Sequence, residues 1–96
     1  MQRNSYVGID GIQRTKESDE IISKNVSAVF DTPAGKEVLN YLRSITIESV
    51  NGPIIEPNQL LHHEGQRYIV AIVENRIKHS KRIKKRLFRN LENIMS

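Results

Sequence analysis

Apolar residues recur every three or four positions over most of this chain of 96 residues, which is the spacing of amphipathic helices. The pattern predicts a first helix that begins at Ser18 or Asp19 and ends near Asp31. Acidic side chains in its opening turn favour the positive end of the helix dipole. The apolar side chains of this segment share one side of the helix: Ile21, Ile22, Val26, Val29 and Phe30.

A second helix is predicted directly after the first, because Thr32 precedes Pro33. A threonine side chain can cap a helix start, and proline fits the first helical position because its missing N–H would be unpaired there anyway. Glu37 falls in the opening turn and favours the same start. Two helices joined so tightly form a corner. The apolar residues that we expect the second helix to bury are Val38, Leu39, Leu42 and Ile45, with Tyr41 at the margin.

The apolar spacing changes between Thr46 and Asn58, where Asn51-Gly52 is a strong turn signal. Pro53 weakens a strand after that turn, because proline has no backbone N–H to donate. We therefore expect a loop here, with at most a minimal β-hairpin over residues 45–55.

The last third of the chain predicts one long helix. Residues 59–95 contain one glycine and no proline, and Ser80 fills the single gap in an otherwise regular apolar spacing. A helix from about His63 onward would be roughly 45 to 50 Å long at 1.5 Å per residue. A break near His79 and Ser80 is the competing interpretation. The apolar positions are Ile69, Val73, Ile77, Ile83, Leu87, Leu91 and Ile94.

The expected fold class is therefore all-α, with a helix–Pro–helix corner and a long C-terminal helix in one small domain over residues 20–96. Residues 1–19 are polar, and we expect them to form a flexible arm in the isolated protein. Cysteine is absent, which excludes disulfides and thiolate chemistry. No stretch approaches the roughly 20 apolar residues that a membrane-spanning helix needs.

Positive charge is concentrated between Arg76 and Asn90, where eight basic residues occur without a carboxylate. Because the whole chain carries +4, the remainder carries −4. A helix with one packed apolar face and this much charge is typical of proteins that meet nucleic acid, an acidic protein surface or lipid headgroups. A solvated helix face is the alternative. Arg76 contributes to this charge but is not a candidate binding residue. The candidate binding residues are the other seven: Lys78, Lys81, Arg82, Lys84, Lys85, Arg86 and Arg89.

Catalytic, metal and cofactor sites are not expected. His62 and His63 are adjacent and would diverge by about 100° on a helix, so they cannot easily share one ion. His79 lies among cations and is predicted to be a surface residue whose neutral form is favoured. The serines lack a glycine elbow with a spaced histidine and acid, and no glycine loop would cradle a phosphate. The sequence therefore does not favour an enzyme.

Arg67 is predicted to lie on the long helix just before its first core positions. From there its guanidinium could reach back to Asp31, Glu37 or the carbonyls around Thr32, while Gly65 would let another backbone approach closely. The favoured interpretation is a half-buried ion pair that fixes the helix corner. Recognition of a partner is the alternative.

Two separated strings resemble a family of small domains from tailed bacteriophages, of the type found in a Bordetella podovirus. The first runs from Phe30 to Leu42 and contains Thr32-Pro33 at the corner, and the second is Glu64-Gly65-Gln66-Arg67 followed by Val70 and Ile72. The family pattern is F-x-T-x-x-G-x-x-V-L-x-x-L, then E-G-x-R opening a hydrophobic helix. The resemblance covers residues 26–77. The matching positions are Phe30, Thr32, Gly35, Val38, Leu39, Leu42, Glu64, Gly65 and Arg67.

The resemblance implies a protein encoded among phage head genes near the portal, without known enzymatic activity. We therefore expect a virion or assembly protein of the head and portal region, present in the host cytoplasm during assembly and forming a homo-oligomer in the particle. Its partners would be the portal or other virion proteins, with non-specific contact to double-stranded DNA through the cationic helix. A small DNA-binding accessory or regulatory protein is the alternative. Membrane association is not favoured, because the apolar face of the last helix lacks tryptophan and has only Phe88 as an aromatic anchor.

Overall fold

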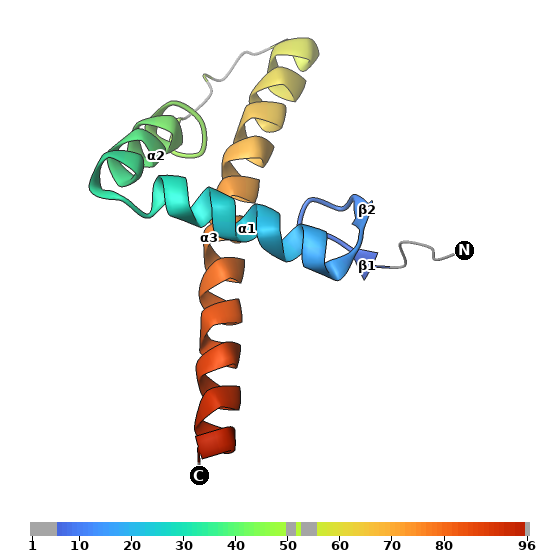
Figure 1. The fold of residues 1–96 in the computed structure, drawn as a ribbon. Coiled ribbons are helices and arrows are strands. Elements are labelled where there is room, and N and C mark those ends of the chain that lie inside the picture. The colour runs from blue at the N-terminus through green and yellow to red at the C-terminus, as the bar shows by residue number, and fades with distance from the viewer. Residues whose placement is uncertain (1–5, 50–51, 53–55, 96) are drawn as a thin grey trace.

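The computed structural model describes residues 6–49, 52 and 56–95. These residues form two short strands, β1 (Tyr6–Val7) and β2 (Gln13–Arg14), and three helices, α1 (Lys16–Phe30), α2 (Pro33–Ile45) and α3 (Pro57–Met95). Helix α1 crosses the middle of α3, and α2 lies beside the first half of α3 (Figure 1). The predicted all-α class, the helix–Pro–helix corner and the long C-terminal helix are confirmed.

The chain enters α1 from a small antiparallel hairpin that pairs Tyr6 with Arg14. Gly11 adopts a positive φ of 81° in its turn, a conformation that glycine tolerates. Helix α1 then begins at Lys16, before the predicted start, because the Thr15 hydroxyl accepts a 3.1 Å hydrogen bond from the N–H of Ser18. The sequence-based hairpin was placed at residues 45–55. Among these, the described residues 45–49 and 52 contain no strand, and the others lie outside the described residues.

The corner between α1 and α2 has the predicted threonine cap and proline, but Glu37 lies beyond the first turn of α2, which contains no acidic residue. The Thr32 hydroxyl accepts a 3.0 Å hydrogen bond from the N–H of Gly35 and donates a 3.0 Å bond to the carbonyl of Val29, with Pro33 at the start of α2. A Cβ atom at Gly35 would overlap the Val29 carbonyl and the backbone of Phe30. Glycine is therefore needed here because the two helices meet at backbone distance.

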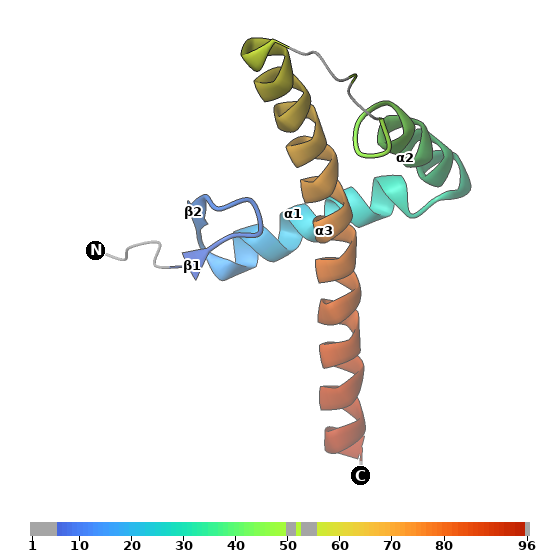
Figure 2. The same cartoon turned by 180° about the vertical axis from the view of Figure 1, so that it is seen from behind.

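Helix α3 is a single helix of 39 residues that begins before the predicted start at His63. It runs unbroken through His79 and Ser80, which are both buried against α1. At 1.5 Å per residue its length is about 58 Å, which is longer than predicted. Figures 1 and 2 show that no other element lies beside its second half, below the crossing with α1.

The centre of the molecule is more polar than the apolar pattern predicts. Among the described residues, Val70 and Ile83 are the only large apolar side chains that are fully buried. The buried side of α1 consists of Asp19, Ser23 and Ser27, spaced by four residues. Asp19 and Ser23 face α3 and pair with its polar side chains, and Ser27 is buried on the same side of α1.

The predicted burial of apolar residues on α1 and α2 is therefore correct only in part. Several of them are half-buried, while others are more than half exposed, and α2 has no fully buried residue. The half-buried set is Ile22, Val26, Phe30, Leu39 and Leu42. The exposed set is Ile21, Val29, Val38, Tyr41 and Ile45.

Candidate nucleic-acid interface

The second half of α3 displays the basic residues that the sequence singles out. All seven candidates are exposed. Within the described part of the chain, the side chains of six of them make neither a hydrogen bond nor an ion pair to another residue. These six are Lys78, Lys81, Arg82, Lys84, Lys85 and Arg89.

Five of these six cations share one side of the helix. At about 100° per residue, they fall within an arc of about 100° on α3, although three of them, Lys78, Lys81 and Arg82, line hollows shared with α1. Ile83 and Ser80 lie on the opposite side and are buried at the crossing with α1. We call the five residues the free cationic face: Lys78, Lys81, Arg82, Lys85 and Arg89.

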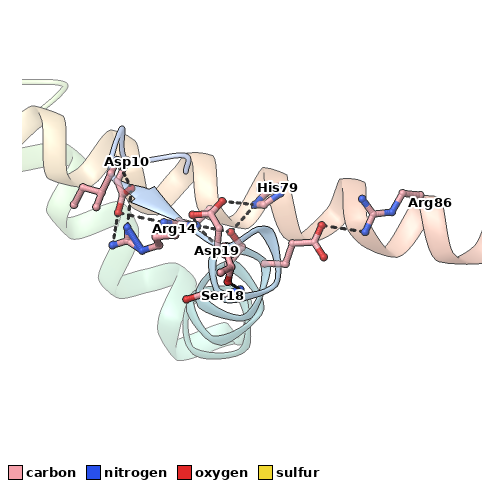
Figure 3. Close-up of polar contacts among 11 residues, drawn as sticks. Asp10, Arg14, Ser18, Asp19, His79 and Arg86 are labelled. Atoms are coloured by element: carbon pink, nitrogen blue, oxygen red, sulfur yellow. Dashed lines mark hydrogen bonds and ion pairs between the residues drawn. The ribbon is translucent and has the colours of Figure 1, made fainter. Parts of the chain in front are cut away.

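Arg86 differs from its neighbours because it has a partner on α1. Its Nη2 donates a 3.0 Å hydrogen bond to Oε2 of Glu20 (Figure 3). The Arg86 side chain remains 46% exposed, so this pair is of the surface kind that contributes at most about 1 kcal/mol. Its charge is partly neutralised inside the protein, and it contributes less to an external contact than the free cationic face does.

Arg76 is not available to a partner, although the sequence counts it in the basic run. Its side chain is 2% exposed. One guanidinium nitrogen, Nη1, donates to Oδ1 of Asp19 at 2.6 Å, to the Asp19 carbonyl at 2.9 Å and to Oγ of Ser23 at 3.1 Å. The other, Nη2, lies 3.3 Å from Oδ2 of Asp10. A signal in the sequence that could have indicated this site is the polar strip of α1, whose Asp19, Ser23 and Ser27 recur at a helical spacing.

Asp10 ties the hairpin to this buried arginine. Its carboxylate accepts a 3.1 Å bond from the N–H of Ile12 and pairs with Arg14 at 2.8 Å. Although burial raises the pKa of Asp10, the Ile12 N–H and the guanidiniums of Arg14 and Arg76 outweigh it and lower the pKa. A Cβ atom at Gly8 would collide with the Asp19 carboxylate, so the hairpin backbone also lies against the crossing. The flexibility of residues 1–19 in the isolated protein stays a prediction.

His79 lies inside the same cluster and not on the surface, so that prediction was wrong. Its Nδ1 is 2.6 Å from Oγ of Ser23 and 4.0 Å from Oδ2 of Asp19 (Figure 3). Because Ser23 accepts from Arg76, its own hydroxyl hydrogen can be donated to the neutral imidazole. Burial lowers the pKa of His79, the nearby Asp19 opposes this shift and Arg82 adds to it. The predicted preference for the neutral form is confirmed, with burial as its first cause.

Arg67 fixes the end of α2 and not the corner at Thr32. Its Nε donates to the Thr46 carbonyl at 2.9 Å, and its Nη2 donates to the Ser49 carbonyl at 2.6 Å. Its Nη1 pairs with Glu64 at 2.8 Å. The predicted contacts to Asp31, Glu37 or Thr32 are wrong because the corner lies at the other end of α2. Carbonyls at a helix end need donors, and Arg67 supplies one to the Thr46 carbonyl at the end of α2 and one to the Ser49 carbonyl that follows it.

Gly65 has no close neighbour where a Cβ atom would lie, so the expected close approach of another backbone is not found. It instead lines an open groove of about 670 Å³ between α2 and the first half of α3. We call this the α2–α3 groove, and most of its lining is apolar: Leu42, Ile45, Leu61, Ile69 and Val70. The sequence missed the groove because it predicted that Leu42 and Ile45 would be covered.

The remaining candidates for chemistry are not brought together. His62 hydrogen-bonds to Gln66 one turn later, at 3.1 Å. Among the described residues, no three His, Asp or Glu side chains converge as a metal site would require. In the same part of the chain, no helix combines the length and the apolar character needed to traverse a bilayer.

Comparison with known proteins found no matching family model, no matching curated protein and no matching solved structure.

Proposed function

We propose that this chain is a non-enzymatic assembly or virion protein that binds double-stranded DNA without sequence preference through the free cationic face. The observation that carries the proposal is the grouping of five cations on one side of α3, none of which is held in an ion pair by the described chain, although Glu74 and Glu92 lie at the two ends of the same side. Charge that is both concentrated and unpaired attracts a polyanion, since binding releases the counterions of that polyanion.

The dimensions of the face suit a DNA backbone. Lys78 and Arg89 are eleven residues apart, which corresponds to about 16 Å along the helix. A duplex carries one phosphate charge per roughly 1.7 Å of axis, so each cation has several phosphates within reach. Lysine and arginine contacts of this kind position a protein on the backbone and do not read the bases. The same face also suits an acidic portal or capsid surface, which is an outcome that the test below distinguishes.

The phage setting is the second part of the proposal. It rests on the resemblance carried by the Thr32–Gly35 corner and by Glu64, Gly65 and Arg67. In this setting the chain is a component of the head and portal region, forms a homo-oligomer and contacts the portal or other virion proteins. Detection of the chain in purified particles supports this setting. Its restriction to infected-cell extract would favour the alternative, a small DNA-binding accessory or regulatory protein.

The binding test compares two triple variants with the same change in net charge. Lys81→Gln/Lys85→Gln/Arg89→Gln removes three members of the free cationic face. Lys16→Gln/Lys24→Gln/Lys36→Gln removes three exposed lysines of α1 and α2, of which Lys36 is paired with Asp31. Fluorescence anisotropy with a labelled duplex of mixed sequence gives the slope of log affinity against log salt concentration. Each lost phosphate contact should reduce this slope by about 0.9.

We expect the α3 variant to lose most of the salt dependence and the control variant to retain it. An equal loss in both variants would show that only net charge matters and would remove the interface. Absence of wild-type binding at low salt would leave the acidic protein surface as the ligand of this face. Tighter binding to one sequence than to others would contradict the non-specific mode.

A further inference from the structure

The far end of α3 carries an apolar surface that nothing in the described chain covers. Beyond the buried Ile83, the apolar residues of the helix are exposed by 52% to 80%. Three of them lie on the side of α3 opposite the free cationic face, and Phe88 flanks them. Together with Lys84, three of the four line a hollow of about 280 Å³. We call these four residues the distal stripe: Leu87, Phe88, Leu91 and Ile94.

A second apolar surface lies at the other end of the same helix. The lining of the α2–α3 groove includes Ile45, Leu61 and Ile69, which are 51%, 70% and 60% exposed. The distal stripe of the same copy cannot reach this groove, because residues 65 and 91 are about 39 Å apart along one continuous helix. Within one copy, neither of these two surfaces can therefore cover the other.

The molecule is more extended than a compact domain of its length. Its radius of gyration is 17.3 Å, whereas a compact domain of this length has about 12.5 Å. With only Val70 and Ile83 fully buried among the described large apolar residues, little apolar surface has been removed from water within one chain.

Charge identifies a second copy as the occupant. Residues 77–95 carry a formal charge of +6, and residues 31–75, which contain the groove, carry −3. Two distal stripes packed on each other would bring two strongly positive segments together, which is repulsive. A distal stripe packed in the groove of another copy brings opposite charges together.

We infer that the distal stripe of one copy docks in the α2–α3 groove of the next copy. This contact joins two different surfaces, so each bound copy still presents an empty groove or an unused stripe, and association continues into a ring or a filament. The free cationic face points away from the contact. The inference does not require DNA binding, and the variants that test the two are different.

The experiment measures molar mass by light scattering coupled to size-exclusion chromatography over a range of protein concentrations. The stripe variant is Leu87→Gln/Leu91→Gln and the groove variant is Leu61→Gln/Ile69→Gln, and both leave the charge unchanged. We expect the wild type to form species of several times 11.1 kDa at high concentration, and each variant to remain at 11.1 kDa.

Mixing the two variants is the decisive measurement. The intact stripe of the groove variant should enter the intact groove of the stripe variant and give a one-to-one dimer of twice 11.1 kDa that grows no further. A matched control, Ile21→Gln/Val29→Gln, changes two exposed apolar residues of α1 and should associate like the wild type. Circular dichroism confirms that each variant keeps its helix content.

Three outcomes would overturn the inference. A wild type that stays monomeric at all concentrations removes the contact. Dimerisation of the groove variant alone would show that distal stripes pair with each other. Failure of the mixture to dimerise, with both variants folded, would show that the stripe and the groove are not partners.

Discussion

Arg76 and Arg89 lie on the same helix but differ in the exposure and pairing of their side chains. Arg76 is 2% exposed and held by Asp19, Asp10 and Ser23 at the crossing with α1, whereas Arg89 is exposed and unpaired within the described residues. Residue type does not separate them. What differs is whether another element supplies carboxylates at that level of α3, and this decides which arginine is structural and which can bind a partner.

The apolar residues of α3 repeat the same contrast. Ile83 and Leu87 are one turn apart on one side of the helix, yet their exposed fractions are 2% and 53%. Helix α1 crosses α3 near its middle, and no other element lies beside the half of α3 that follows the crossing (Figure 1). The crossing is thus held by a few buried groups, while the side chains of α3 beyond Ile83 are exposed.

The largest effect is expected from breaking the buried ion pair. Asp19→Ala leaves the Arg76 guanidinium in a buried site without its closest carboxylate, which typically costs about 3–5 kcal/mol of unfolding free energy. Lys85→Gln on the free cationic face should change stability by about 0.5 kcal/mol or less. Urea denaturation followed by circular dichroism measures both.

A double variant shows whether the loss of unfolding free energy in Asp19→Ala comes from the unpaired charge or from the change in side-chain shape. Asp19→Leu/Arg76→Leu removes both charges, so it should be clearly less destabilising than Asp19→Ala. Equal losses in the two variants would mean that shape, and not the unpaired charge, holds the crossing together.

The next effect compares two positions of one apolar side. Ile83→Ala removes buried methylene groups and should cost about 2–5 kcal/mol, whereas Leu87→Ala should cost about 0.5 kcal/mol or less in dilute protein. At high protein concentration, the difference in melting temperature between the Leu87 variant and the wild type should increase, because association stabilises the folded state. Thermal melts at two protein concentrations test this, and equal losses at both positions in dilute protein would contradict the contrast.

A smaller effect concerns pH at the crossing. Because the pKa of His79 is lowered in the folded state, the unfolded chain takes up this proton first as pH falls. The unfolding free energy should therefore be highest above pH 6.5 and decrease below it, by at most about 1.4 kcal/mol for each unit that separates the two pKa values. In His79→Gln this decrease should shrink between pH 7.5 and 5.5. A variant with the same pH dependence as the wild type would place the titrating group elsewhere.

Local features of the fold were predictable because they depend on neighbours in the chain. The Thr32 cap, Pro33 at the start of α2 and the continuous apolar spacing of α3 act through hydrogen bonds and side-chain contacts within one or two turns. Arg67 was singled out as a structural position but received the wrong partners, since these depend on where α2 lies. The close approach of two backbones was expected at Gly65 and is found at Gly35.

The sequence by itself determined three helices, one corner and a concentration of positive charge near the C-terminus. Only the tertiary structure decided which charges are used internally, because Asp19 and Arg76 are 57 residues apart and no local pattern links them. It also decided that Ile83 is covered while the distal stripe is not. Burial depends on which distant element crosses the helix at that level, and apolar periodicity specifies a face of a helix without specifying how far along the helix that face is covered.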